Sequence, residues 1–159
     1  CYKVTTYTPA CESDFSNILC AIPTQPGQEV LASVADPLQT GKWVRQGKGK
    51  NATTEFVLTS SFVQGDAVVI QATVTDENGI PVPDAIATLA ISGPESVNLT
   101  TGPSDANGVA EATWNTSAPN KKGQGGTVIG GYSATITGLT ASGFVWNEFP
   151  ASATFTISQ

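Results

Sequence analysis

Residues 67–92 read AVVIQATVTDENGIPVPDAIATLAIS, and this stretch decides the fold class. Its first ten residues place Val68, Ile70 and Val74 on one face and mostly polar side chains on the other, a period of two that is typical of a β-strand buried on one side. The same alternation returns in AIATLAIS, after a segment of Pro, Asn, Asp and Gly that is typical of a turn. The stretch therefore predicts two strands joined by a tight turn.

The rest of the chain has the same texture. Strand-like segments such as TTEFVLTSSF, VAEATW, GGYSATITGLT and ASATFTI alternate with turn residues, and no window shows the apolar spacing of a substantial helix. Only 13% of the residues are charged, against about 25% in average globular proteins. We expect an all-β protein whose seven or eight strands form an antiparallel β-sandwich, because a sheet with one apolar face must bury it on a second sheet. A barrel is the less favoured alternative.

The 159 residues fit one domain and an extension. Residues 1–28 hold every cysteine and end in Pro and Gly, so we interpret them as a tail or linker, and residues 29–159 as the sandwich. Within the sandwich, LQTGKWVRQGKGKNA and GFVWNEFP are interpreted as exposed connections. The chain shows neither a Met nor a signal peptide, which indicates a mature or excised piece of a larger protein.

Cysteines and sequons both favour a secreted, extracellular protein. The cysteines are Cys1, Cys11 and Cys20, a cluster that suggests a local disulfide in which Cys11 pairs with one of the other two. The remaining thiol would be free or bonded outside the chain. Three sequons are candidate N-glycan acceptors, at Asn51, Asn98 and Asn115.

The net charge of −6 and the pI of 4.4 exclude whole classes of partner. Seven scattered Lys and Arg cannot neutralise a run of phosphates, so we expect no nucleic-acid partner. An anionic membrane surface is disfavoured for the same reason. Because no apolar run approaches the roughly 20 residues of a membrane span, we expect no membrane insertion either.

The sequence Asp-x-Asn-Gly occurs twice, from Asp76 and from Asp105. Each copy suits a hairpin loop in which Asp accepts backbone N–H groups and Gly takes a positive φ. The alternative is a calcium site shared by the carboxylates of Asp76, Glu77 and Asp105. A calcium loop of the EF-hand type would need a carboxylate at its twelfth position, and neither copy has one. Tight turns are therefore favoured over Ca²⁺, which stays possible as a cofactor.

The sequence favours a non-catalytic protein. It contains no His, which removes the usual general base, the triad imidazole and the commonest zinc ligand. The acids are scattered, with no pair that a motif places as a glycosidase would need. We expect Trp114 and Tyr132 to lie in the core.

The other aromatic residues are candidate ligand contacts. They lie in the expected connections, at Trp43, Phe144, Trp146 and Phe149. Exposed rings of this kind could stack on sugars, and they could equally cap the sandwich or dock a neighbouring domain. Capping or docking is the favoured interpretation.

Three spaced motifs carry a family resemblance. VVIQATVTDENGIPVPDAIATLAI, then TTGPSDANGVAEATW, then GGYSATITGL resemble bacterial immunoglobulin-like domains of the invasin and intimin type, and also the C-terminal immunoglobulin-like modules of secreted hydrolases. The resemblance covers residues 29–159 and implies an immunoglobulin-like sandwich. The sequons and the cysteine-bearing tail depart from the bacterial pattern and indicate a eukaryotic secreted protein.

Such modules serve several functions, so the resemblance leaves function open. The favoured expectation is an accessory module that acts as a spacer or docks onto a missing catalytic or neighbouring domain. The alternatives are a carbohydrate-binding module with a polysaccharide partner and a calcium-stiffened adhesion domain.

Overall fold

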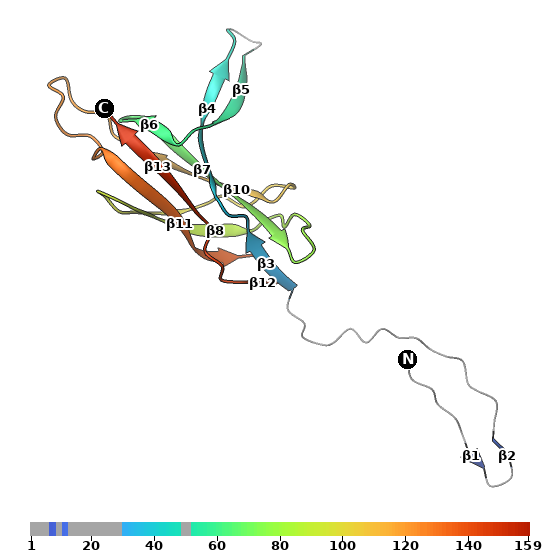
Figure 1. The fold of residues 1–159 in the computed structure, drawn as a ribbon. Helices are drawn as coiled ribbons and strands as arrows, with labels where there is room; N and C mark the ends of the chain where they lie inside the picture. Colours follow the sequence, from blue (N-terminus) through green and yellow to red (C-terminus); the bar gives the residue numbers. More distant parts are fainter. Residues whose placement is uncertain (1–6, 9–10, 13–29, 49–51) are drawn as a thin grey trace.

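The computed structural model describes residues 7–8, 11–12, 30–48 and 52–159. This described part is all-β (Figure 1), and it holds no helix that could cross a membrane. Two short strands, β1 (Tyr7–Thr8) and β2 (Cys11–Glu12), pair with each other in a sheet of their own. The remaining strands are β3 (Val30–Val34), β4 (Gln39–Gln46), β5 (Thr53–Leu58), β6 (Ser61–Val63), β7 (Ala67–Asp76), β8 (Ile86–Ser92), β9 (Val97–Thr100), β10 (Val109–Asn115), β11 (Gly130–Thr140), β12 (Phe144–Trp146) and β13 (Ser152–Ser158).

These eleven strands form two sheets. The first runs in the order β12-β3-β7-β4-β5, with β10 on the other side of β7, and the second runs β6-β13-β11-β8-β9. The neighbours β3-β7-β10 and β8-β11-β13 have the order of strands A-B-E and C-F-G in immunoglobulin sandwiches. The expected all-β sandwich is therefore confirmed.

Two details differ from the expectation. The sandwich has more strands than the seven or eight expected, and its sheets are mixed, because β12 pairs parallel with β3 and β6 pairs parallel with β13. Both parallel strands are three-residue edge strands, too short to leave a period in the sequence. The other additional strand is β4, which forms a hairpin with β5; β5 lies in the segment TTEFVLTSSF that the sequence predicts as a strand.

The β4–β5 hairpin projects from the sandwich (Figure 1). Strand β3 pairs with one end of β7 and β4 with its middle, so both share one edge of that strand. Beyond Gly41 the chain leaves β7 and pairs with β5 alone. The segment interpreted as an exposed loop is thus a strand in residues 39–46, and its polar sequence reflects a ribbon that lies outside the core.

The core lies between the two sheets. It includes the alternating apolar residues of β7, β8 and β11 that the sequence predicts, and Trp114 and Tyr132 are buried as expected. The rings of Tyr132 and Phe155 stack at 5.7 Å, and Trp114 meets Tyr132 edge-on at 5.2 Å. Aromatic pairs of this geometry add to the stabilisation that burial provides.

Candidate functional site

The two Asp-x-Asn-Gly loops are tight turns with the same hydrogen bonds. Asp76 Oδ1 accepts the N–H groups of Asn78 and Ile80, each at 2.8 Å. Asp105 Oδ1 accepts those of Asn107 and Val109, at 2.8 and 2.9 Å. The Ile80 and Val109 amides hold the pKa of Asp76 and of Asp105 below the ordinary value of 3.8, because they favour the charged carboxylate.

The structure does not gather Asp76, Glu77 and Asp105 into a ligand set. Across the part of the chain that it describes, no three Asp, Glu, Cys or His side chains lie together where they could hold a metal ion. One oxygen of each Asp is already occupied by two amides of its own loop, whereas Ca²⁺ needs six or more oxygen ligands in one place. The two Asp residues therefore have a structural role that accounts for them.

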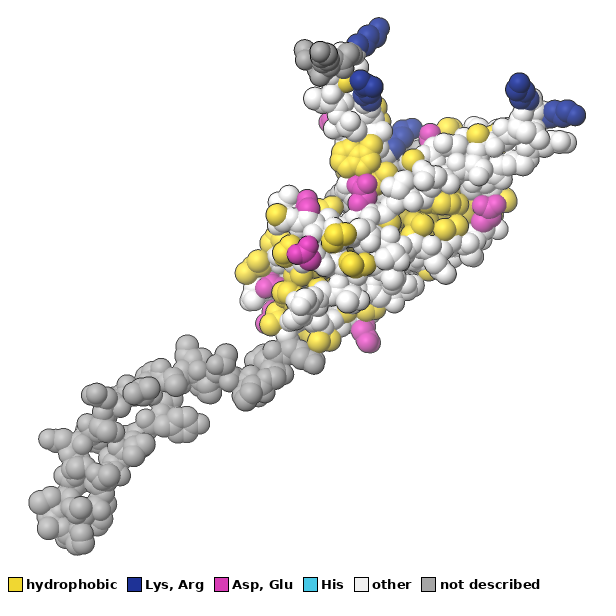
Figure 2. All heavy atoms as spheres, turned by 180° about the vertical axis from the view of Figure 1, so that it is seen from behind, with side chains coloured by type: hydrophobic (Ala, Val, Ile, Leu, Met, Phe, Trp, Pro, Cys, Tyr) yellow, Lys and Arg dark blue, Asp and Glu magenta, His cyan; other side chains and the backbone are white. Residues whose placement is uncertain are grey.

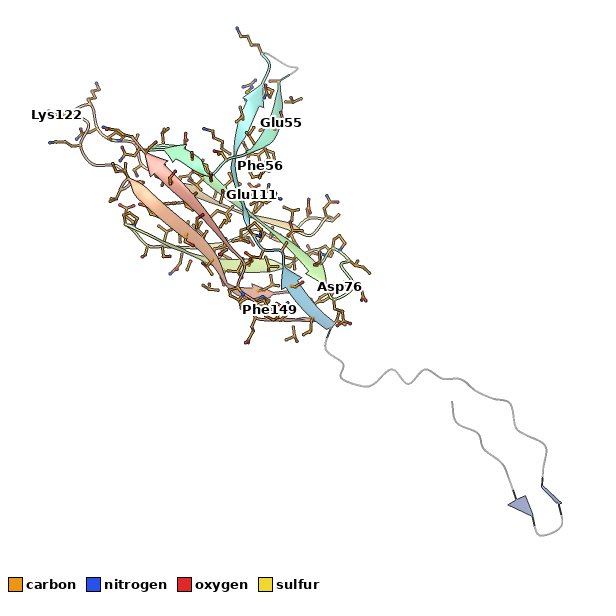
Figure 3. All side chains as sticks on the ribbon, viewed as in Figure 1. Glu55, Phe56, Asp76, Glu111, Lys122 and Phe149 are labelled. Atoms are coloured by element: carbon orange, nitrogen blue, oxygen red, sulfur yellow. The ribbon has the colours of Figure 1, made fainter. Side chains whose placement is uncertain are left out.

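The aromatic residues of the C-terminal connection do not form a common surface. Phe144 and Trp146 lie on β12, partly buried and packed against the core, so they cap the sandwich. Phe149 is 72% exposed and lies at the end of the sandwich opposite the hairpin (Figure 3). Sequence reasoning placed Phe144 and Trp146 in a connection because three residues of strand are too few to show a period.

Trp43 is the candidate aromatic residue whose ring is held in place by neighbouring side chains. Its side chain is 48% exposed, and its Nε1–H donates to both carboxylate oxygens of Glu111, at 3.0 and 3.1 Å. Gln71 Nε2 donates to the same carboxylate at 3.2 Å. On its other side the Trp43 ring lies beside the Phe56 ring, with centroids 5.3 Å apart and an interplanar angle of 57°. We call these four side chains the tryptophan platform.

The platform joins the hairpin to the body of the sandwich. Trp43 and Phe56 are cross-strand partners on β4 and β5, whereas Gln71 and Glu111 are partners on β7 and β10. Figure 3 shows Phe56 and Glu111 close together at the base of the hairpin. Both carboxylate oxygens of Glu111 accept N–H groups, so the arrangement orients the Trp43 ring.

A glycine allows the ring contact. A Cβ at Gly41 would overlap the Phe56 ring and approach the Val57 carbonyl oxygen at 2.5 Å. Lys42 Nζ also pairs with Asp66 Oδ2 at 3.3 Å, which ties the same end of β4 to the turn before β7. These contacts fix the hairpin where it leaves the sandwich.

Sequence reasoning found Trp43 but missed its three partners. Glu111 had a signal, since it is the one charged residue of β10 and lies on the face opposite Ala110, Ala112 and Trp114. Its role as an acceptor for Trp43 depends on strand order, because the two residues are 68 positions apart. Nothing local in the sequence specifies that contact.

The remaining expected sites are only partly described. Asn98 on β9 and Asn115 at the end of β10 are exposed, as a glycan acceptor must be, and Asn51 lies outside the described residues. Cys1 and Cys20 also lie outside them, and for Cys11 the structure describes only its place in β2. Disulfide pairing therefore stays a prediction.

Comparison with known proteins adds no family to this description. A scan against protein-family models finds no match, and a search of curated proteins finds no similar sequence. The resemblance to invasin-type domains thus rests on the three motifs quoted above. The immunoglobulin order of the strands supports the fold alone, because many unrelated functions share it.

Proposed function

We propose that this chain is a non-catalytic accessory module of a larger secreted protein, and that it docks onto a neighbouring domain through the β4–β5 hairpin. One observation carries the proposal: Trp43 is half-exposed on a projecting ribbon and its ring is held in one orientation by Glu111. Trp is enriched in protein interfaces, and a ring already held in one orientation loses less freedom on binding.

The composition of the hairpin supports docking to a protein. Trp, Tyr, Phe and Arg are enriched in the centres of protein interfaces, and this ribbon carries Trp43, Phe56 and Arg45. It also exposes aliphatic side chains, with Leu58 62% exposed. Figure 2 shows hydrophobic atoms of the hairpin next to acidic atoms at its base and Lys and Arg atoms at its tip. A partner would meet an apolar centre with a polar rim.

The fixed geometry lowers the cost of binding. An immobilised side chain loses about 0.5–1.5 kcal/mol of rotamer freedom on association. Since Trp43 is already held by Glu111 and Phe56, most of that loss has occurred in the free module. The free edge of β5, which pairs only with β4 among the described strands, offers backbone groups to the same partner.

Hydrogen exchange tests the proposal. The amides of residues 39–58 should exchange more slowly in the larger protein than in the isolated chain, because docking would cover the hairpin. The substitution Trp43→Ala in the larger protein should remove most of that protection. Phe149→Ala is the matched control, since it removes an exposed ring at the opposite end. Equal exchange of the hairpin in the two proteins would refute docking.

A second candidate uses the same ring for sugar. The exposed face of Trp43 is a flat apolar surface that could stack on a pyranose, and a neutral polysaccharide would need no charge from the module. A pull-down on insoluble polysaccharides separates the two candidates. Retention that Trp43→Ala abolishes would favour sugar binding over docking.

A further inference from the structure

The second sheet has an outer surface unlike that of the first. Its strands β6, β13, β11, β8 and β9 contain no charged residue. The first sheet carries charges on four of its strands, at Lys42, Arg45, Glu55, Asp76 and Glu111. Solvated sheet faces and edges normally carry charges, which keep proteins soluble and block unwanted strand pairing. A face of five strands without charge therefore needs another explanation.

Small hydroxyl groups are concentrated on the part of this face formed by β6, β13, β11 and the end of β8. Ser133 on β11 is the register partner of Ser92 on β8 and of Thr154 on β13, so their hydroxyls form a row across three strands. The side-chain hydroxyls of these three residues make no hydrogen bond to any described residue, and those of Ser92 and Thr154 are exposed. The next row is formed by Thr156 on β13 and Ser61 on β6. We call this surface the hydroxyl face.

A groove of about 520 Å³ runs along the hydroxyl face. Its lining consists of Gly131, the aromatic residues Tyr132 and Phe155, and six hydroxyl residues, namely Ser60, Ser61, Ser92, Ser133, Thr154 and Thr156. Gly131 is exposed, and a Cβ built there would meet nothing within 4 Å. Since Gly131 stands beside Thr156 in the ladder, the missing side chain leaves a hollow next to the hydroxyls of Ser133, Thr154 and Thr156.

The chemistry of the face excludes most classes of ligand. A nucleic acid or an anionic membrane would require Lys and Arg, and these strands have none. A protein partner would be expected to find aromatic or Arg anchors, whereas Ser is depleted in interfaces and Ser and Thr are under-represented among their hot spots. What remains is a neutral partner that presents many donors and acceptors of its own.

We propose that the hydroxyl face binds a neutral polysaccharide, with one stretch of the glycan chain lying in the groove over Gly131. Each Ser or Thr hydroxyl both donates and accepts, as sugar hydroxyls do. Hydroxyls of neighbouring strands stand about 4.8 Å apart, and those two residues apart on one strand about 6.7 Å apart. The face thus presents a regular array of donors and acceptors. This site is separate from the tryptophan platform, which lies on the other sheet.

The test is retention of the whole chain on insoluble cellulose, chitin and β-1,3-glucan. The wild type should be retained on at least one of the three, and retention should persist at high salt because no charge is involved. Gly131→Glu fills the groove and places a charge in it; Gly131 has no left-handed φ, so the backbone accepts the change. We expect at least a tenfold loss of retention. Thr113→Glu on β10 is the matched control, since it adds the same charge to an exposed position of the other sheet.

The outcomes separate this site from Trp43. Loss in Gly131→Glu, with Thr113→Glu and Trp43→Ala retained, supports the proposal. Loss in Trp43→Ala alone would overturn it and favour sugar binding at the platform. Absence of wild-type retention on all three polymers would overturn it as well, while leaving the docking proposal intact. If Gly131→Glu does not fold, the double substitution Ser133→Ala and Thr154→Ala removes two free hydroxyls from the same row, and unchanged retention there would refute the proposal.

Discussion

The two Asp-x-Asn-Gly turns allow a stability experiment in which the sequence motif is constant and only the surroundings change. Gly79 and Gly108 occupy the same place in their turns and have φ values of 77° and 76°. A Cβ at Gly79 would meet nothing within 4 Å, whereas a Cβ at Gly108 would run into the Val74 carbonyl oxygen. Replacing each glycine by Ala therefore separates the cost of the backbone conformation from the cost of crowding.

The magnitudes follow from these surroundings. A left-handed conformation costs a non-glycine residue roughly 1–2 kcal/mol, so Gly79→Ala should lower the free energy of unfolding by about that amount. At Gly108 overpacking adds about 1–3 kcal/mol. The backbone of Val74 cannot move aside, because its N–H donates to the Gly108 carbonyl at 2.8 Å and its carbonyl accepts the Val82 N–H at 3.0 Å. We expect Gly108→Ala to cost about 3 kcal/mol.

Urea unfolding followed by Trp fluorescence would measure both variants. Thermal midpoints should agree, at about 3 °C for each kcal/mol in a domain of this size. Equal losses in the two variants would show that φ alone sets the cost and that Val74 yields without penalty. A larger loss in Gly79→Ala would refute the reasoning altogether.

Two further predictions concern buried and charged groups. Ser104 is buried, and its hydroxyl donates to the Val82 carbonyl at 2.7 Å while accepting the Ala85 N–H at 2.9 Å. Because Ser104→Ala leaves both backbone groups unpaired, it should lower the free energy of unfolding in urea by about 2 kcal/mol. A change below about 0.5 kcal/mol would contradict this. Folding lowers the pKa values of Asp76 and Asp105 below the ordinary value of 3.8. Near and below that pH the unfolded chain therefore binds more protons than the folded one. The stability falls as the pH falls through the folded pKa values. Replacing both residues by Asn, which keeps an acceptor oxygen, should flatten the dependence of stability on pH below the ordinary value of 3.8. An unchanged acid slope would show that other carboxylates cause it.

Much of the sandwich was predictable because its signal is local. Val68, Ile70 and Val74 are all buried on one face of β7 and the other face is mostly polar, with Val69 as an exception, since a strand that packs on one side fixes a period of two. The Asp-x-Asn-Gly turns were predictable for the same reason, because every hydrogen bond that defines them lies within four residues. Short stretches of the sequence are therefore enough to predict the fold class and the turns.

The candidate site was not predictable to the same extent. Trp43 was singled out as an aromatic residue in a loop, but it lies on β4, and Phe144 and Trp146 were grouped with it although they cap the opposite end of the first sheet. Whether an aromatic ring in a short segment is covered depends on which strand becomes an edge. That choice is made by pairings such as β12 with β3, which join positions 114 residues apart.

The position of the hairpin in the chain explains how one small sandwich can carry two different surfaces. The projecting hairpin, which starts after Gly41, lies in the chain between β3, which belongs to the first sheet, and β6, which belongs to the second. The hairpin begins where β4 leaves the edge of β7 and ends where Thr59 donates its N–H to the Thr40 carbonyl at 3.0 Å. The ribbon thus closes at its base. Charged and aromatic residues added there extend the first sheet only, and the second sheet keeps its uncharged hydroxyl face. Substitutions in the hairpin should therefore leave the hydroxyl face unaffected, and this independence is what allows Trp43→Ala and Gly131→Glu to be read as tests of separate sites.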